Sequence, residues 1–304
     1  MTTTDVAAVQ RRTLRLLFAT QILGGIGVAV GASVGALLAA DLVGVAVSGL
    51  AQSAVVVGAA LFTIPAAAIV RRGGRRPSLA AGYAVAVLGA VLIVFAAMRG
   101  AIPVLFAGFF LFGGATAANL QARYAATDLA PTALRARHLS LIVWATTIGA
   151  VAGPPLAAVA GAALAPYGIP PLAGPFFFSA VLLALAALCL VLLLRPDPAV
   201  LAGTTLGNPE PLVPSPQPRG LRAALRAIVS LPSAVLGVSA MAVGHMVMVG
   251  IMAMTPVHIR GAGHDAAHTL RVVGVVLSFH IAGMYALSPV FGWLTDRLGR
   301  RLVI

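Results

Sequence analysis

The chain has 304 residues, of which 60% are hydrophobic and only 9% are charged. An average soluble domain has about 25% charged residues, so this composition excludes an ordinary soluble protein and predicts an integral membrane protein. The net charge of +13 is the balance of 20 basic and 7 acidic residues; all the basic residues are arginines, which are distributed between apolar segments and do not gather on one soluble face. This distribution argues against nucleic acid as a partner. The only cysteine, Cys189, excludes an intrachain disulfide.

Apolar segments of roughly 20 residues are long enough to cross the hydrocarbon core of a bilayer as helices. The first of these segments is too long for the apolar core of a cleaved signal peptide, so we expect it to be retained as a span. The sequence therefore predicts an all-α membrane protein. Eight spans are expected, at residues 14–40, 45–70, 78–98, 102–124, 139–164, 173–194, 232–258 and 270–294.

The distribution of arginine predicts the orientation of these spans. With a cytoplasmic N-terminus, only Arg99, Arg260 and Arg271 lie in the outer segments, and the other arginines lie on the cytoplasmic side or close to it. Cytoplasmic loops of membrane proteins carry this kind of excess of basic residues. We therefore predict a multi-pass protein of the inner (plasma) membrane with its N-terminus in the cytoplasm.

A proline-rich segment separates the first six spans from the last two. It is predicted to be a polyproline-like cytoplasmic linker without a core of its own. Near its end, leucine and isoleucine alternate with arginine at helical spacing, which favours a short helix in the membrane interface. The expected regions are a six-helix half at 1–194, the linker with its interfacial helix at 195–230, and two further spans at 231–304.

The most informative motif is the basic turn at residues 292–301, GWLTDRLGRR, which follows the eighth span. It resembles the loop signature G-x-L-x-D-R-x-G-R-R of the major facilitator superfamily, a family of secondary transporters. A second, altered copy ends at Arg76, with Arg71 at the position of the aspartate. The resemblance implies two six-helix halves, so eight spans of an expected twelve are present. It assigns a gating role to Gly292, Asp296, Arg297, Gly299, Arg300 and Arg301.

The fifth span contains Gly149, Gly153 and Pro154, which resemble the antiporter motif of drug-exporting facilitators. Small residues at i and i+4 allow two helices to approach closely, and proline removes a backbone hydrogen bond and bends the helix. The resemblance implies a hinge that favours export. The alternative is an ordinary seam of small residues that only packs two helices together.

Polar residues within spans are costly unless they face a cavity or a partner helix. In facilitators the first, fourth and seventh helices line the central cavity, so the resemblance makes Gln21, Asn119 and His245 the preferred cavity residues. Each of them could equally form a hydrogen bond between helices. Polar residues on the lateral helices are less favoured as cavity residues: Gln52, Tyr83 and Thr146.

One face of the seventh span carries Met241, His245, Met248 and Met252 at helical spacing. Methionine is an adaptable lining for a cavity that accepts varied apolar ligands, and this is the interpretation we favour, with no bound metal. Thioether and imidazole groups also suit soft cations such as Cu(I). A soft-metal path through His245, Met248 and Met252 is therefore the alternative.

The sequence has no phosphate-binding loop and no pair of nucleophile and base, which argues against ATP-driven transport and against an enzyme. We expect a secondary transporter that exports a small organic molecule by proton antiport, with no cofactor. Its partners would be the substrate, protons and the lipid bilayer. The candidates for proton coupling are His245, His280 and Asp41. A soft-metal transporter and a non-transporting, truncated membrane protein remain as alternatives.

Overall fold

The computed structural model describes residues 3–205, 221–263 and 265–286, together with positions 294, 297, 298 and 302. Every regular element among these residues is a helix, and eight helices are long and apolar enough to cross a membrane. The prediction of an all-α membrane protein with eight spans is confirmed. The spanning helices are α1 (Thr3–Val43), α2 (Val45–Gly73), α3 (Arg75–Arg99), α4 (Ile102–Ala125), α5 (Arg135–Leu164), α6 (Gly174–Leu193), α9 (Pro232–Gly261) and α10 (Ala266–Ala286).

The first three helices are joined by single glycines. Gly44 links α1 to α2 and Gly74 links α2 to α3, with φ angles of 90° and 89°. Residues with a Cβ atom rarely adopt such angles, so glycine is the residue that permits a connection of this length. Proline stands in the first turn of α4, α6 and α9, where its missing N–H has no helical partner to lose.

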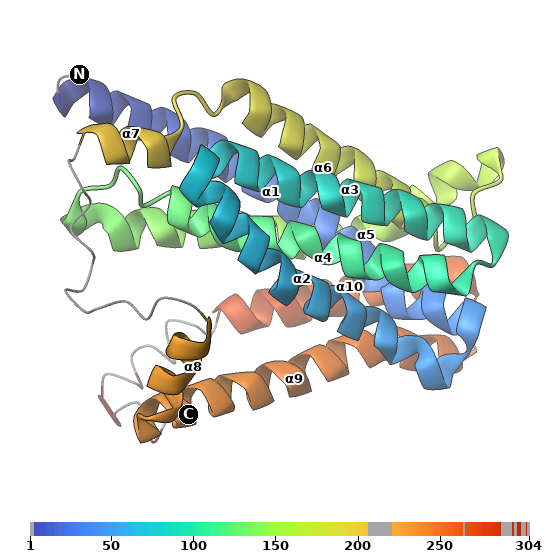
Figure 1. The fold of residues 1–304 in the computed structure, drawn as a ribbon. Coiled ribbons are helices and arrows are strands. Elements are labelled where there is room, and N and C mark those ends of the chain that lie inside the picture. Colours follow the sequence, from blue (N-terminus) through green and yellow to red (C-terminus); the bar gives the residue numbers. More distant parts are fainter. Residues whose placement is uncertain are drawn as a thin grey trace.

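Helices α1 to α6 form a six-helix body, and α9 and α10 lie along one side of it (Figure 1). The apolar window of α1 is 72% buried, against 0% for α9, so α1 is at the centre of the packing and α9 is at its margin. Helix α10 packs against α5, while α9 contacts α1 and α2. The largest buried side chains of the body include Phe109, Phe112 and Phe176.

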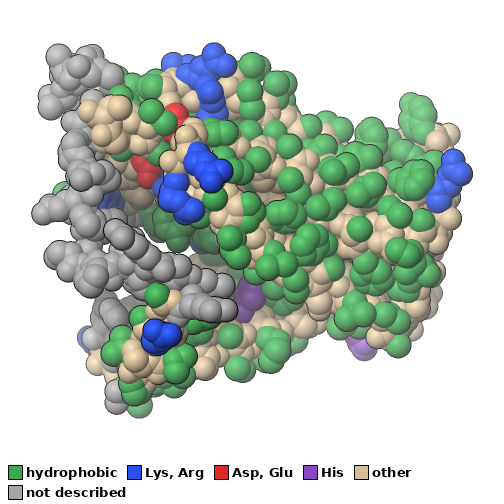
Figure 2. All heavy atoms as spheres, in the orientation of Figure 1, with side chains coloured by type: hydrophobic (Ala, Val, Ile, Leu, Met, Phe, Trp, Pro, Cys, Tyr) green, Lys and Arg blue, Asp and Glu red, His purple; other side chains and the backbone are tan. Residues whose placement is uncertain are grey.

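The flank of the molecule is covered by hydrophobic side chains, and arginines are visible towards the two ends of the helices (Figure 2). Exposed residues on α3 include Leu88, Val91 and Phe95, and α6 exposes Leu188 and Leu192. A surface of this kind is unfavourable in water but suits the hydrocarbon core of a bilayer. The N-terminus, α7 (Pro198–Thr205) and α8 (Leu221–Val229) lie at the same end of the bundle (Figure 1).

The first part of the expected linker is folded. Helix α7 begins directly after Asp197, whose carboxylate accepts the backbone N–H groups of Ala199 (3.0 Å) and Val200 (3.3 Å). Aspartate at the N-cap and proline at the first helical position favour a helix start, which explains why this proline-containing stretch is helical. The expected interfacial helix is α8, and residues 206–220 lie outside the described part of the chain.

Candidate functional site

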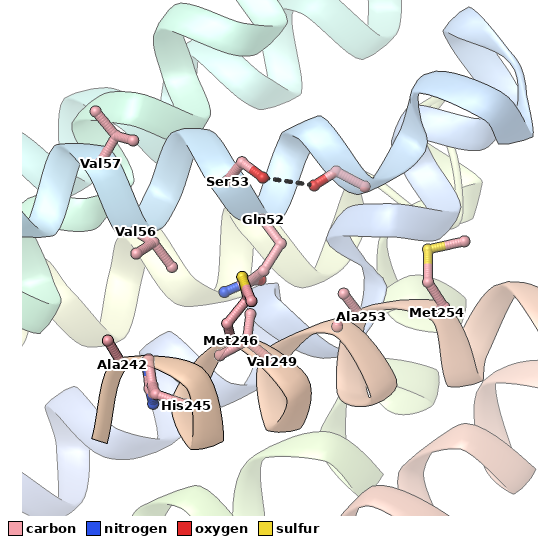
Figure 3. A pocket seen from close by; sticks show the side chains of 12 residues that line it. Gln52, Ser53, Val56, Val57, Ala242, His245, Met246, Val249, Ala253 and Met254 are labelled. Atoms are coloured by element: carbon pink, nitrogen blue, oxygen red, sulfur yellow. Dashed lines mark hydrogen bonds between the residues drawn. The ribbon is translucent and has the colours of Figure 1, made fainter. Parts of the chain in front are cut away.

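A cavity with a volume of about 550 Å³ lies between α2 and α9 (Figure 3). Its wall is mostly Gly, Ala, Val and Met, and three side chains contribute polar atoms. Two of them, Gln52 and Ser53, belong to α2, and the third, His245, belongs to α9. The Ser53 hydroxyl donates to the carbonyl of Gly49 in its own helix (3.3 Å), so Gln52 and His245 are the groups most available to a ligand.

The face of α9 that lines this cavity differs from the expected methionine stripe. His245 lies on it together with Met246 and Met254, whereas Met241 and Met248 do not. Met252 lines a neighbouring cavity of about 100 Å³ between α1, α2, α5, α9 and α10. The sequence pattern identifies one face of α9, but the rotation of the helix is set by its packing on α2, which the pattern does not contain.

The soft-metal alternative required His245, Met248 and Met252, and the structure does not place these three in one cavity. Within the described ranges, no group of three or more His, Cys, Asp or Glu residues is close enough together to hold a metal ion. In the loop between α9 and α10, the backbone N–H of His268 donates to Asp265 (2.7 Å) and lowers the pKa of that carboxyl below its usual range. Asp265 thus caps the start of α10.

Gln21 and Asn119 are brought together, but inside the packed body. The Gln21 amide donates to Tyr83 (3.0 Å) and to Asn119 (3.3 Å), and the Tyr83 hydroxyl donates to Asn119 (2.6 Å). Thr146 donates to the Gln21 carbonyl oxygen (3.0 Å). This buried network joins α1, α3, α4 and α5, and its members satisfy one another. None of these residues lines the cavity between α2 and α9.

The antiporter-like motif is the place where α5 touches α1. A Cβ atom at Gly149 would lie 2.6 Å from the carbonyl oxygen of Ile22, and one at Gly153 would lie 2.5 Å from the Cβ of Ala29. The opposing residue on α1 is Gly25, whose own Cβ would lie 3.2 Å from the Cα of Gly149. Two helix backbones approach this closely only where side chains are absent.

The prolines of the same motif face α10. Pro155 cannot donate to the carbonyl of Val151, one turn earlier in α5. Ser278 of α10 supplies the missing donor, with its hydroxyl 2.7 Å from that oxygen. A Cβ atom at Gly274 would lie 3.0 Å from the carbonyl oxygen of Pro154. The proline-containing turn of α5 is therefore joined to α10 by a hydrogen bond and a close backbone contact.

Asp41, a candidate for proton coupling, lies in the last turn of α1 and forms an ion pair with Arg260 at the end of α9. A second guanidinium nitrogen of Arg260 lies 3.1 Å from the other carboxylate oxygen. Both side chains are partly exposed. This pair links the body to α9 at the end opposite to the N-terminus. His280, another candidate, is exposed on α10 and does not line the cavity between α2 and α9.

The turn between α2 and α3 is held by acidic residues from distant parts of the chain. Arg75 donates to both carboxylate oxygens of Asp128 (2.8 and 3.0 Å) and to Gln121 (2.8 Å). Asp197 accepts the backbone N–H groups of Arg75 (3.0 Å) and Arg76 (2.6 Å). Asp197 therefore caps α3 as well as α7, and sequence reasoning missed it.

The second copy of the loop signature falls largely on residues that are not described. Gly292, Asp296, Gly299, Arg300 and Arg301 lie outside the described part of the chain, and Arg297 is described and exposed. The gating role that the resemblance assigns to this turn therefore stays a prediction.

A bundle of eight apolar helices, with a cavity between the six-helix body and α9, defines a multi-pass α-helical membrane protein. The sequence profile of the Major Facilitator Superfamily matches residues 16–304, so the chain belongs to this family. Its members are transporters and not enzymes.

The chain is 42% identical over 291 residues to the uncharacterized MFS-type transporter YdeG of Bacillus subtilis (strain 168), and 38% identical over 291 residues to YddS of the same strain. Each alignment covers 95% of this chain, and the chain spans 66% and 65% of the lengths of these relatives. It is 29% identical over 311 residues to the riboflavin transporter RfnT of Brucella anthropi, covering 99% of this chain and 70% of RfnT.

Among solved structures, the chain resembles a bacterial homologue of the human lysosomal transporter Spinster, in an inward-facing and unoccupied conformation. The TM-score is 0.62 at 19% sequence identity, and the match covers 96% of this chain and 64% of the other. At this identity the likeness concerns the fold alone.

Proposed function

We propose that the protein is a secondary transporter that exports a small organic molecule in exchange for protons. The observation that carries the proposal is the composition of the cavity between α2 and α9: a mostly apolar wall that contains one titratable side chain, His245. Histidine is the side chain whose ordinary pKa lies within the physiological range. Its protonation would add a charge to an apolar cavity, which opposes simultaneous occupation by an apolar substrate.

The orientation belongs to the same proposal. The excess of arginine at the end of the bundle that carries the N-terminus, α7 and α8 supports a cytoplasmic location for this end in the inner membrane. In a Cys189→Ala background, an impermeant thiol reagent applied to intact cells should label Ala262→Cys and leave Ala227→Cys unlabelled. Labelling of Ala227→Cys in intact cells would reverse the proposed orientation.

The transport test uses the protein reconstituted in liposomes with an acidic lumen and an alkaline bath. A panel of neutral and charged organic compounds is supplied outside, including riboflavin, because one relative is a riboflavin transporter. Proton antiport predicts uptake of at least one compound that stops when nigericin and potassium collapse the pH gradient. Uptake that is unchanged by nigericin would contradict proton antiport.

The role of His245 is tested by His245→Gln, which keeps hydrogen bonding but cannot titrate. We expect uptake to lose its dependence on the pH gradient while binding of the same compound persists. His280→Gln is the matched control, because His280 does not line this cavity. If His280→Gln and not His245→Gln removes the dependence on pH, the coupling group has been misassigned.

A further inference from the structure

One polar side chain, Gln52, is shared by three neighbouring cavities. It lines the cavity of about 550 Å³ between α2 and α9, the cavity of about 100 Å³ beside α5 and α10, and a cavity of about 70 Å³ inside the body. Figure 3 shows the Gln52 side chain pointing from α2 towards α9, where it lies beside Met246 and Val249. A ligand that entered any of these cavities would meet this amide.

The Gln52 amide forms no hydrogen bond with any described residue, unlike several polar groups within the spans. Gln21 and Asn119 belong to the buried network, and Ser278 donates to α5. Ser33 and Ser53 donate to carbonyls of their own helices. An amide that leaves water without gaining a partner costs free energy, so a ligand that displaces water from the half-buried Gln52 binds better if it offers a hydrogen-bonding group.

The charge of the walls restricts the ligand. The described residues that line the three cavities include no Asp, Glu, Lys or Arg, and His245 is the only titratable side chain among them. A charged ligand would lose its hydration here without gaining a counter-ion, which is strongly unfavourable in an apolar environment. The walls therefore favour a neutral ligand.

The smallest of the three cavities is flanked by Phe109, Phe112 and Phe176. The ring of Phe176 meets each of the other two at 5.7 Å between centroids and an interplanar angle of 74°. This edge-to-face arrangement offers both ring faces and ring edges to an occupant. An apolar, preferably aromatic body suits the surroundings of the Gln52 amide.

We propose that Gln52 determines the specificity of the cavity, and that its ligand is a neutral, largely apolar molecule with an amide-like edge, such as a lactam or an imide. A primary amide presents one N–H donor and one carbonyl acceptor side by side. An N–H next to a carbonyl on the ligand would form two parallel hydrogen bonds with it. The inference rests on the proposed function only in identifying this ligand as the transported molecule.

The test compares two probes with the same ring system. Quinolin-2-one carries the lactam N–H, and its N-methyl derivative lacks it. Binding to the protein in lipid nanodiscs is measured by equilibrium dialysis, with empty nanodiscs to correct for partition into lipid. We expect the unmutated protein to prefer quinolin-2-one about tenfold, which corresponds to about 1.4 kcal/mol for one well-made hydrogen bond.

Gln52→Leu keeps the approximate volume and removes both hydrogen-bonding groups, so the preference should fall below about twofold. The control Met98→Leu, at an exposed residue outside the three cavities, should retain it. Equal binding of the two probes to the unmutated protein, or a preference that survives Gln52→Leu, would overturn the proposal. The probe comparison needs no variant, so the proposal stays testable even if Gln52→Leu does not fold.

The same probes separate this inference from the proposed function. Selective binding through Gln52 without uptake driven by a pH gradient would overturn proton-coupled export and keep the ligand class. Gradient-driven uptake of compounds from the transport panel that is unchanged by Gln52→Leu would overturn the ligand class and keep export.

Discussion

The contact between α1 and α5 allows a sharp test of the packing, through the substitution Gly149→Ala. The added Cβ atom would lie 2.6 Å from the carbonyl oxygen of Ile22 and 2.8 Å from the backbone nitrogen of Ile26. Both atoms belong to the backbone of α1, so neither can rotate away as a side chain would. The two helices must separate to admit a single methyl group.

The expected cost follows from two opposing effects. Overpacking of a close contact costs about 1 to 3 kcal/mol, and alanine gains at most about 1 kcal/mol over glycine within a helix. Because the contact is with backbone that cannot rotate away, we expect the upper part of the overpacking range, about 2 to 3 kcal/mol, and after the gain of about 1 kcal/mol Gly149→Ala should destabilise the protein by about 1 to 2 kcal/mol. Gly244→Ala is the matched control, because a Cβ atom at Gly244 in α9 meets nothing within 4 Å. The control should be neutral or slightly stabilising.

The assay is reversible unfolding in mixed detergent micelles, in which increasing fractions of SDS are added and loss of helix packing is monitored by tryptophan fluorescence. Gly149→Ala should unfold at a lower SDS fraction than the unmutated protein, and Gly244→Ala should not. Equal midpoints for the two variants would refute the close backbone contact between α1 and α5.

Three other contacts predict measurable effects in the same unfolding assay. Arg75→Gln removes the charged donors to the largely buried Asp128 and should cost about 1.5 to 3 kcal/mol; unchanged stability would mean that this pair contributes nothing to the fold. Asp41→Asn and Arg260→Gln, measured singly and together, should show a coupling of at most about 1 kcal/mol because both side chains are partly exposed. A coupling well above this value would indicate a buried pair. Ser278→Ala leaves a carbonyl of α5 without its donor and should cost about 1 to 3 kcal/mol, whereas Ser278→Thr keeps the hydroxyl; equal stability of these two variants would contradict the hydrogen bond.

The spans could be predicted from the sequence because their signal is local. Long apolar segments interrupted by arginine, glycine or proline determine where a helix can cross a bilayer and where it must end. The single-residue connections at Gly44 and Gly74 are local in the same sense, because a glycine between two apolar segments marks the point where one helix ends and the next begins. Local patterns do not report which helices touch, so the marginal position of α9 became visible only in three dimensions.

The candidate site was less predictable, as Gln52 and Gln21 illustrate. The helix plan of the family favoured Gln21 because it lies on the first helix, and the structure places this residue in a buried network. Gln52 was less favoured because α2 is lateral in that plan, yet its amide points into the cavity. The difference depends on the rotation of each helix about its axis, which many distant contacts determine together.

The turn between α2 and α3 shows how a lost motif residue can be compensated by residues elsewhere. The aspartate of the loop signature is replaced by Arg71, but carboxylates still hold the turn, because Asp128 binds the Arg75 side chain and Asp197 caps α3. A Cβ atom at Gly74 would lie 2.5 Å from the Asp197 carboxylate. The glycine of the signature is therefore required by a contact more than a hundred residues away in sequence.

The polar contacts at the two ends of the bundle have different consequences for movement. At the end with the N-terminus, Arg75 and its acidic partners belong to α3, to the segment after α4 and to the start of α7, so they stabilise the body without binding α9 or α10. At the opposite end, Asp41 and Arg260 connect the body directly to α9. An ion pair as exposed as this one contributes at most about 1 kcal/mol. It can therefore favour contact between α9 and the body at this end while remaining easily exchanged for contacts with water.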